Sequence, residues 1–227
     1  MKIYHIMKKS GFDTTFRSAM LYALSAVQTL KKQCNNPIDL KVYIASGFYN
    51  MNVKSYATDV LNFIDSKTTK SLQNLLSNLD VEIFGAYSSP KDLQKIKSAL
   101  SSVASSVHVY YKYRFHSKLF AIVINNNPFF EIIGSSNITI PAYEGLQYSK
   151  KGVSSFSLNT ETDLILYNDD LYTTYNQPPI DLTLEPNENI MQLSYDEKMN
   201  TNITLQNRMV SIVNYFSEIK KGMKELT

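Results

Sequence analysis

The feature that most constrains the fold of this chain is the alternation of short apolar runs with longer periodic segments. Six runs rich in β-branched and aromatic residues have the length and composition of strands. They lie at residues 40–45, 81–86, 107–113, 119–125, 129–133 and 162–167. Apolar residues recur at helical spacing between the first three, which is typical of β-α-β units. The sequence therefore predicts an α/β domain whose mixed sheet carries helices on both faces.

Four helices are predicted from apolar residues that repeat at steps of three and four. They cover about residues 14–33, 53–78 with a break near 68–69, 90–100 and 203–226. The last of them has a regular seam that includes Ile212, Phe216 and Ile219. This seam fits either packing on its own domain or a coiled coil between two copies of the chain.

The chain of 227 residues is long enough for one ordinary core, with 44% apolar and 19% charged residues. Because a single core grows efficiently up to roughly 250 residues, we expect one domain. We place the main domain at residues 1–175 and an irregular segment with a C-terminal helix at 176–227, packed on the domain or at a dimer interface. Residues 138–159 lack a clear period and predict a long functional or mobile loop.

Several classes of protein are disfavoured by the composition. The longest uncharged apolar stretch, Ser18–Leu30, is shorter than the ~20 residues that a membrane helix needs. Asp13 and Arg17 lie just before it, and Lys31 and Lys32 follow where small residues should mark a cleavage site. We therefore expect a cytoplasmic protein without a membrane partner. The single cysteine, Cys34, excludes an intrachain disulfide, and no Cys/His spacing predicts a metal site or a cofactor. The net charge of +3 is compatible with a nucleic-acid partner.

Two short motifs stand at the ends of neighbouring predicted strands. His116-Ser117-Lys118 precedes the run at 119–125, and Gly134-Ser135-Ser136-Asn137 follows the run at 129–133. From composition alone, both motifs together are expected roughly 0.02 times in a chain of this length. Since the two strands are neighbours in sequence and predicted to be adjacent, their polar side chains can converge on one pocket.

These motifs resemble the signature of the phospholipase D superfamily, which is His-x-Lys followed by Gly-Ser-x-Asn and later by Asn-x-Glu. Asn159-Thr160-Glu161 supplies the last element. The resemblance covers about residues 40–168 and is strongest to the catalytic domain of restriction endonucleases of the BfiI and NgoFVII type. Those enzymes also lack the acid that this sequence replaces with Val123. The resemblance implies a phospholipase D-like fold and a homodimer, since superfamily members with one motif work as dimers.

The chemistry of these side chains predicts a phosphodiesterase that needs no metal. A neutral imidazole is a competent nucleophile near neutral pH, and a protonated one is a competent acid for the leaving oxygen. Two histidines are needed, so a second copy of His116 must come from a partner subunit. Lys118 and Asn137, with Ser135, would hold the nonbridging oxygens. Glu161 would accept a hydrogen bond from the far nitrogen of His116 and fix its tautomer.

We expect DNA as the substrate, in a restriction or defence nuclease. Lys112, Arg114, Lys150 and Lys151 flank the motif strand or the long loop and are candidates for phosphate contacts. The residues after Asn168 are too few for a separate recognition domain, so a recognition, helicase or methyltransferase subunit is a possible further partner.

Two other functions fit parts of the sequence. The same chemistry on a phospholipid would give a phospholipase or phosphatidyltransferase, although the chain shows no apolar anchor. A noncatalytic DNA-binding subunit would keep the fold alone, but the intact His116, Lys118 and Asn137 argue against it.

Overall fold

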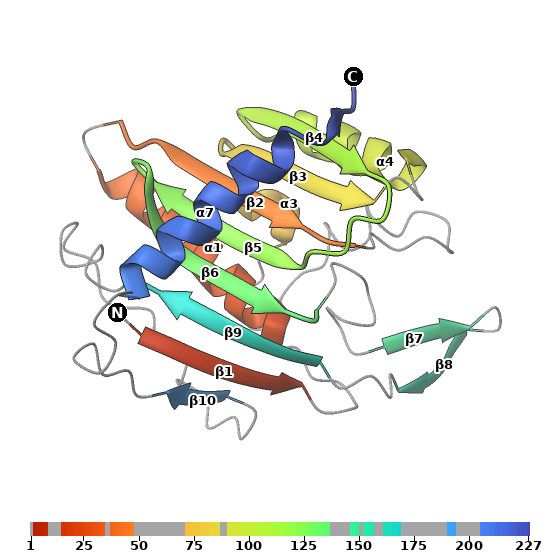
Figure 1. Ribbon diagram of the computed structural model, residues 1–227, viewed down its shortest axis with the longest axis horizontal. Coiled ribbons are helices and arrows are strands. Elements are labelled where there is room, and N and C mark those ends of the chain that lie inside the picture. Colours follow the sequence, from red (N-terminus) through yellow and green to blue (C-terminus); the bar gives the residue numbers. More distant parts are fainter. Residues whose placement is uncertain are drawn as a thin grey trace.

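A nine-stranded mixed sheet forms the centre of the protein, and helices pack on its two faces (Figure 1). The structure is a computed structural model. It describes residues 2–8, 15–34, 37–47, 71–86, 90–136, 146–149, 152–156, 161–168, 190–193 and 205–227.

The strands of this sheet follow the order β10-β1-β9-β6-β5-β2-β3-β4-β11. Their bounds are β1 Lys2–Lys8, β2 Leu40–Ala45, β3 Asp80–Ala86, β4 Ser106–Lys112, β5 Leu119–Ile124, β6 Asn127–Gly134, β9 Glu161–Tyr167, β10 Ile190–Leu193 and β11 Lys224–Glu225. The pairs β2–β3 and β3–β4 are parallel, and the other neighbours are antiparallel. A separate hairpin joins β7 (Leu146–Ser149) to β8 (Gly152–Phe156).

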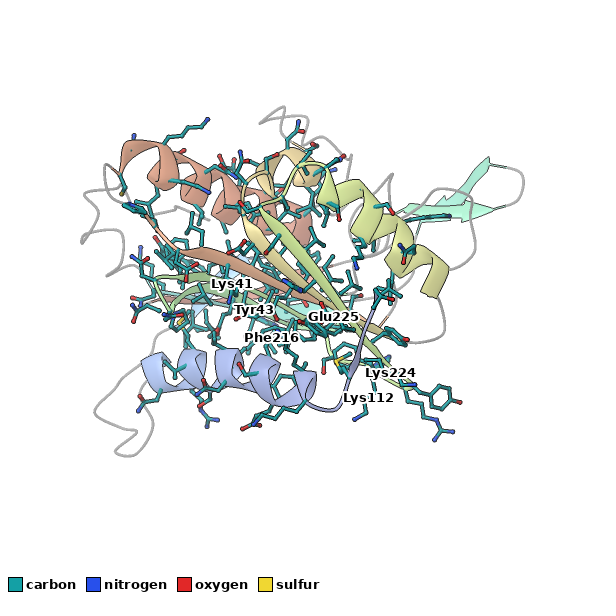
Figure 2. The ribbon with its side chains drawn as sticks, turned by 90° about the horizontal axis from the view of Figure 1, so that it is seen from above. Lys41, Tyr43, Lys112, Phe216, Lys224 and Glu225 are labelled. Carbon is teal, nitrogen blue, oxygen red and sulfur yellow. The ribbon has the colours of Figure 1, made fainter. Side chains whose placement is uncertain are left out.

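Helices cover both faces of the sheet. Figure 2 shows α1 (Thr15–Gln33), α3 (Leu72–Leu75) and α4 (Pro90–Ser101) on one face and α7 (Leu205–Lys220) on the other. The helix α4 connects two parallel strands, β3 and β4, which need a crossover of this kind. The observed architecture is the predicted mixed α/β class with helices on both faces.

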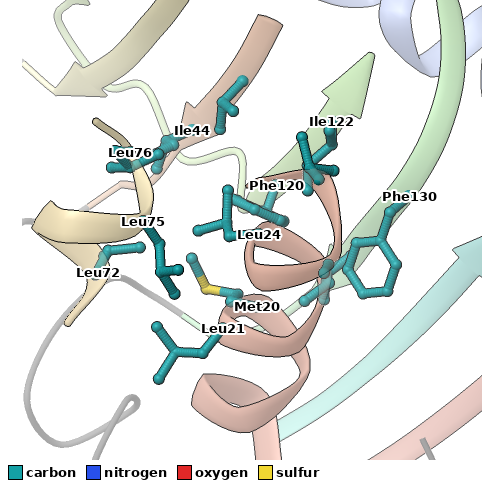
Figure 3. Packing of buried hydrophobic residues seen from close by; sticks show 14 of the residues in the cluster. Met20, Leu21, Leu24, Ile44, Leu72, Leu75, Leu76, Phe120, Ile122 and Phe130 are labelled. Atoms are coloured by element: carbon teal, nitrogen blue, oxygen red, sulfur yellow. The ribbon is translucent and has the colours of Figure 1, made fainter. Parts of the chain in front are cut away.

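The larger part of the core lies between α1 and the sheet. Met20, Leu21 and Leu24 of α1 are fully buried against Phe120 of β5 and Phe130 of β6 (Figure 3). The leucines of α3 close the side of this cluster, as the same view shows. Burying one such side chain contributes about 1.5–3 kcal/mol, so this face supplies much of the driving force for folding.

The second face is closed by α7 through an aromatic stack. The ring of Phe216, which is fully buried, stacks on Tyr43 of β2 with centroids 4.7 Å apart and also packs against Phe84 of β3. One turn further on, Lys220 Nζ lies 3.2 Å from Glu82 and 4.5 Å from the centre of the Tyr110 ring. The last helix of the chain therefore packs on its own sheet. In this setting burial, with help from the Glu82 charge, raises the pKa of Tyr43 to about 12.

The structure differs from the sequence-based prediction in several peripheral strands. Residues 2–8, expected to be a leading segment, form β1 between β9 and β10. Burial alternates along this strand, with Tyr4 and Ile6 buried. The sequence does not show this alternation clearly, because Ile3 and Met7 on the opposite face are also apolar. Strands β7, β8 and β10 likewise lie in stretches that were expected to be irregular. Most of the second predicted helix, residues 53–70, lies outside the described residues.

The last helix ends earlier than its apolar repeat predicts. It stops at Lys220, where the N–H groups of the next three residues donate to carbonyls three positions back. This tighter pattern is typical of a helix C-terminus and turns the chain at Gly222. Leu226, expected to continue the helical seam, instead donates its N–H to Val109 O at 2.8 Å beside β4.

A buried carboxyl group lies beneath α7. Glu131 of β6 is fully buried, and neither of its carboxylate oxygens has a hydrogen-bond partner among the residues that the structure describes. Its cross-strand neighbours are Ala121 and Leu166, which belong to the apolar clusters under α7. Burial raises the pKa of Glu131 to about 9. The side chain is therefore neutral in the folded protein at neutral pH.

We expect Glu131→Met to stabilise the protein, and to do so increasingly as the pH rises. The unfolded carboxyl, with a pKa near 4.5, loses its proton above that pH, whereas the folded one holds it up to about pH 9. Stability is therefore lost between these values, by up to about 1.4 kcal/mol per pH unit. Thermal unfolding measured from about pH 5 to pH 8 tests this slope. The exposed Glu218→Met is the matched control, and a gain that does not change with pH would contradict the prediction.

Candidate active site

The His-x-Lys motif lies in the segment that leads from β4 into β5. A turn at Tyr113-Arg114 reverses the chain, with Phe115 N–H donating to Lys112 O at 3.4 Å. Arg114 has a φ of 59°, which is a costly conformation for a residue with a side chain. Phe115 is only 8% exposed and anchors the segment in the cluster under α7. The anchor fixes the next residue, His116, at the surface.

Residues from two other parts of the chain contact the motif segment. Gly47, which follows β2, lies so close that a Cβ there would be 3.2 Å from His116 Cδ2 and 3.3 Å from its Cα. Ser117 Oγ and Tyr215 Oη of α7 are 2.8 Å apart and share a hydrogen bond. The imidazole is exposed to solvent. The motif segment is thus fixed while its reactive ring stays accessible.

Lys118 touches the imidazole directly. Its Nζ lies 3.1 Å from His116 Nδ1, 3.3 Å from His116 Nε2 and 3.2 Å from the carbonyl oxygen of His116. An ammonium group can only donate, so it can hydrogen-bond to a ring nitrogen only when that nitrogen carries no proton. The contact thus places a cationic group directly against an exposed imidazole.

The Gly-Ser-Ser part of the second motif is tied to the start of β9. Ser135 N–H donates to Thr162 O at 3.1 Å, and Thr162 N–H donates to Ser135 Oγ at 2.9 Å. The buried carboxylate of Asp163 accepts from Ser136 N–H at 3.2 Å and from Ser136 Oγ at 2.6 Å. These bonds fix the turn in which the motif ends.

The two motifs meet because β5 and β6 are neighbours. Gly134 N–H lies 3.4 Å from Lys118 O, and Lys118, Gly134, Ser136 and Asp163 line one small pocket. The ends of the two strands therefore meet at Lys118, Gly134 and Ser136. Ser135 is half-buried, and its hydroxyl group bonds to the β9 backbone.

The other predicted residues are placed only in part. Lys112 and Arg114 are exposed next to the motif segment. Glu161 begins β9, and its backbone pairs with Lys8 of β1. Three residues, Asn137, Lys150 and Lys151, lie outside the described residues.

Sequence patterns missed Asp163 and Gly47 as parts of this site. Asp163 directly precedes the apolar part of β9, residues 164–167, and lies opposite the motif glycine, Gly134, in the β6–β9 ladder. A charged residue in such a strand is a usable signal, because carboxylates are rarely buried without partners. Gly47 gave no comparable signal, since its role depends on the antiparallel pairing of β2 with β5.

Neither a metal cluster nor a membrane helix is found within the described part of the chain. No three His, Cys, Asp or Glu side chains there are grouped so that they would bind a metal ion. No described helix has the length and apolar character needed to cross a membrane.

Comparisons with known proteins do not assign a family. No family model and no curated protein matches the chain. Solved structures with partial similarity include TrmBL2, an archaeal chromatin protein with a novel mode of DNA binding, at 8% identity and a TM-score of 0.32. Another is a mutant of yeast tyrosyl-DNA phosphodiesterase, at 10% identity and a TM-score of 0.35.

Both matches cover about three quarters of this chain and about half of the matched structure. The first covers 78% of this chain and 49% of TrmBL2, and the second covers 73% of this chain and 47% of the yeast enzyme. A further structure of the yeast enzyme matches at 11% identity and a TM-score of 0.29, over 73% of this chain and 46% of that one. The chain thus spans about half the length of the structures that it matches.

We expect Gly134→Ala to destabilise the protein and to disturb the turn of the second motif. The added Cβ would overlap Asp163 Oδ1 and the Thr162 carbonyl oxygen, and would lie 2.7 Å from Asp163 Cα. Overpacking of this kind costs typically about 1–3 kcal/mol. Gly222→Ala is the matched control, because its Cβ would find its nearest atoms at 3.7 and 3.8 Å. Thermal unfolding of both variants measures the effect, and equal stability of the two would contradict it.

Proposed function

We propose that the protein is a metal-independent DNA phosphodiesterase, an endonuclease of a restriction or defence system. The observation that carries the proposal is the contact between Lys118 Nζ and the exposed His116 imidazole, beside the Gly-Ser-Ser turn. An exposed imidazole with an adjacent cation suits a phosphate group that carries negative charge. The motif resemblance to the phospholipase D superfamily points to the same reaction.

In the proposed mechanism, His116 of one subunit attacks phosphorus. A bond forms between the imidazole nitrogen and phosphorus, and the bond to the leaving oxygen breaks. His116 of a second subunit gives its proton to that oxygen. Water then attacks the phosphohistidine, with the second imidazole taking up the proton, and releases the phosphate end.

Four donor groups stabilise the charge on the phosphoryl oxygens in this proposal. Lys118 and Asn137 of each of the two subunits supply these groups, and Ser135 lies next to them in the motif. Glu161 accepts a hydrogen bond from the second ring nitrogen of His116 and stabilises the imidazolium as it forms. Lys112, Arg114, Lys150 and Lys151 contact neighbouring phosphates. A separate subunit supplies recognition of the target sequence.

We expect the wild-type protein to nick plasmid DNA in excess EDTA and His116→Ala to lose this activity by about 100- to 10,000-fold, since the attacking or protonating group is gone. His108→Ala is the matched control, because His108 is an exposed histidine that pairs with Glu225 away from the motifs. Gel analysis of plasmid forms measures the rates. Cleavage by the His116→Ala variant at the wild-type rate would contradict the proposal, as would absence of cleavage by the wild type.

The two alternative functions are separate outcomes of that experiment. Release of a phospholipid headgroup by a protein that does not cleave DNA would identify a lipid phosphodiesterase. Binding of DNA without cleavage would identify a noncatalytic subunit.

We expect the active unit to be a dimer in which both subunits share one site. When wild-type and His116→Ala chains are co-expressed in equal amounts, about one quarter of randomly assembled dimers keep both histidines. Cleavage should therefore fall to about one quarter of the wild-type rate for the same total protein, whereas independent monomers would keep about one half. Light scattering on the same samples gives the mass of the particle. An active monomer would contradict the two-histidine mechanism.

A further inference from the structure

The turn before the motif presents an aromatic ring to solvent. Among the described residues, Tyr113 is the most exposed large apolar side chain, with 68% of its surface open. Its neighbour Phe115 is 8% exposed, so two aromatic rings two positions apart have opposite environments. The buried ring anchors the turn and the exposed one extends from it.

This exposed ring is held next to positive charge. The guanidinium carbon of Arg114 lies 5.2 Å from the centre of the Tyr113 ring, within the range of a cation–π contact. Arg114 reaches this place through the left-handed backbone conformation described above. Local strain of this kind is often retained where the position of a side chain has a function.

Three lysines extend the positive charge along the same edge of the sheet. Lys112 and Lys224 lie at this edge in Figure 2. Lys224 pairs with Tyr111 through the β11–β4 ladder, and Lys112 Nζ is next to Gly222, which follows Lys221. Within the described part of the chain, none of these three lysines or Arg114 forms a salt bridge. Among the described residues, this edge therefore offers an aromatic face beside cations that form no ion pair.

From this arrangement we infer that the Tyr113 turn binds single-stranded DNA, with an unpaired base stacked on the Tyr113 ring and Arg114 and Lys112 on the adjoining phosphates. Aromatic rings in a positively charged groove are the usual means of binding unpaired nucleotides. In the interior of a duplex each base face is covered by its neighbours, so a protruding ring can stack there only on a base that has left the helix. The ring thus selects for unpaired DNA, whereas the lysines alone would not.

The inference rests on the proposed function for its relation to the scissile bond. Three Cα–Cα steps lead from Tyr113 to His116 and span at most about 11 Å. Successive nucleotides of one strand are spaced by about 3.4 Å along a duplex and further apart when extended. The stacked base therefore lies within roughly three nucleotides of a phosphate held at His116. The proposed substrate class is a single-stranded segment or a frayed end.

The test measures binding apart from cleavage. All proteins carry His116→Ala, so that labelled oligothymidylate and a labelled blunt duplex stay intact during fluorescence anisotropy titrations. We expect Tyr113→Ala to weaken binding of oligothymidylate by roughly 5- to 100-fold and to leave duplex binding within about twofold. Tyr113→Phe keeps the ring and should keep the affinity. Lys32→Ala, an exposed change near the C-terminal end of α1, is the control that removes a lysine from another part of the protein.

The outcomes separate this inference from the proposed catalysis. An equal loss for both DNA forms, or no loss for either, would overturn the stacking role of Tyr113 even when the wild type cleaves DNA in EDTA. A selective loss for oligothymidylate would support the role even when the wild type cleaves nothing. Failure of the His116→Ala protein to bind either DNA would overturn it as well.

Discussion

The pairing of β5 between β2 and β6 is the constraint on which the rest of the site depends. This strand is antiparallel to both neighbours, so its first residue lies next to the last residues of each. The segment before β5 carries His116 and Lys118, the end of β2 continues to Gly47, and the end of β6 carries the Gly-Ser-Ser turn. Because side chains on paired strands are only about 5 Å apart, three chain segments distant in sequence meet at one edge.

Much of the fold can be predicted from the sequence, because the central strands and the helix α1 have clear patterns of apolar residues. The strand β5, whose residues are all apolar, is buried on both faces, and α1 has a clear apolar stripe; both begin and end close to the predicted residues. Elements at the margins were harder to predict. Residues 2–8 alternate in burial but not in polarity, and the two residues of β11 form a strand only because β4 offers an open edge. Tertiary pairing decides the structure of such segments, and local propensity does not.

The candidate site was predictable where residue identity alone carries the chemistry. A histidine two positions before a lysine, and a glycine before serines, are visible in any sequence. The groups that hold them are not, because they belong to other strands. Asp163 supports the turn through two hydrogen bonds, and Gly47 supports His116 by having no side chain; neither role follows from the neighbours of these residues in sequence. The buried Glu131, unlike Asp163, has no described donor and lies away from this edge.

Through the hydrogen bond between Ser117 and Tyr215, the last helix helps to fix the position of the His-x-Lys motif. The segment from Phe115 to Lys118 is not part of a regular strand, and a free chain of that length would lose conformational entropy whenever it bound an anion. Here Phe115 is buried under α7, Gly47 lies against His116, and Tyr215 of α7 bonds to Ser117. Most of that ordering is therefore completed during folding, so the proposed binding of a phosphate would meet a preorganised segment.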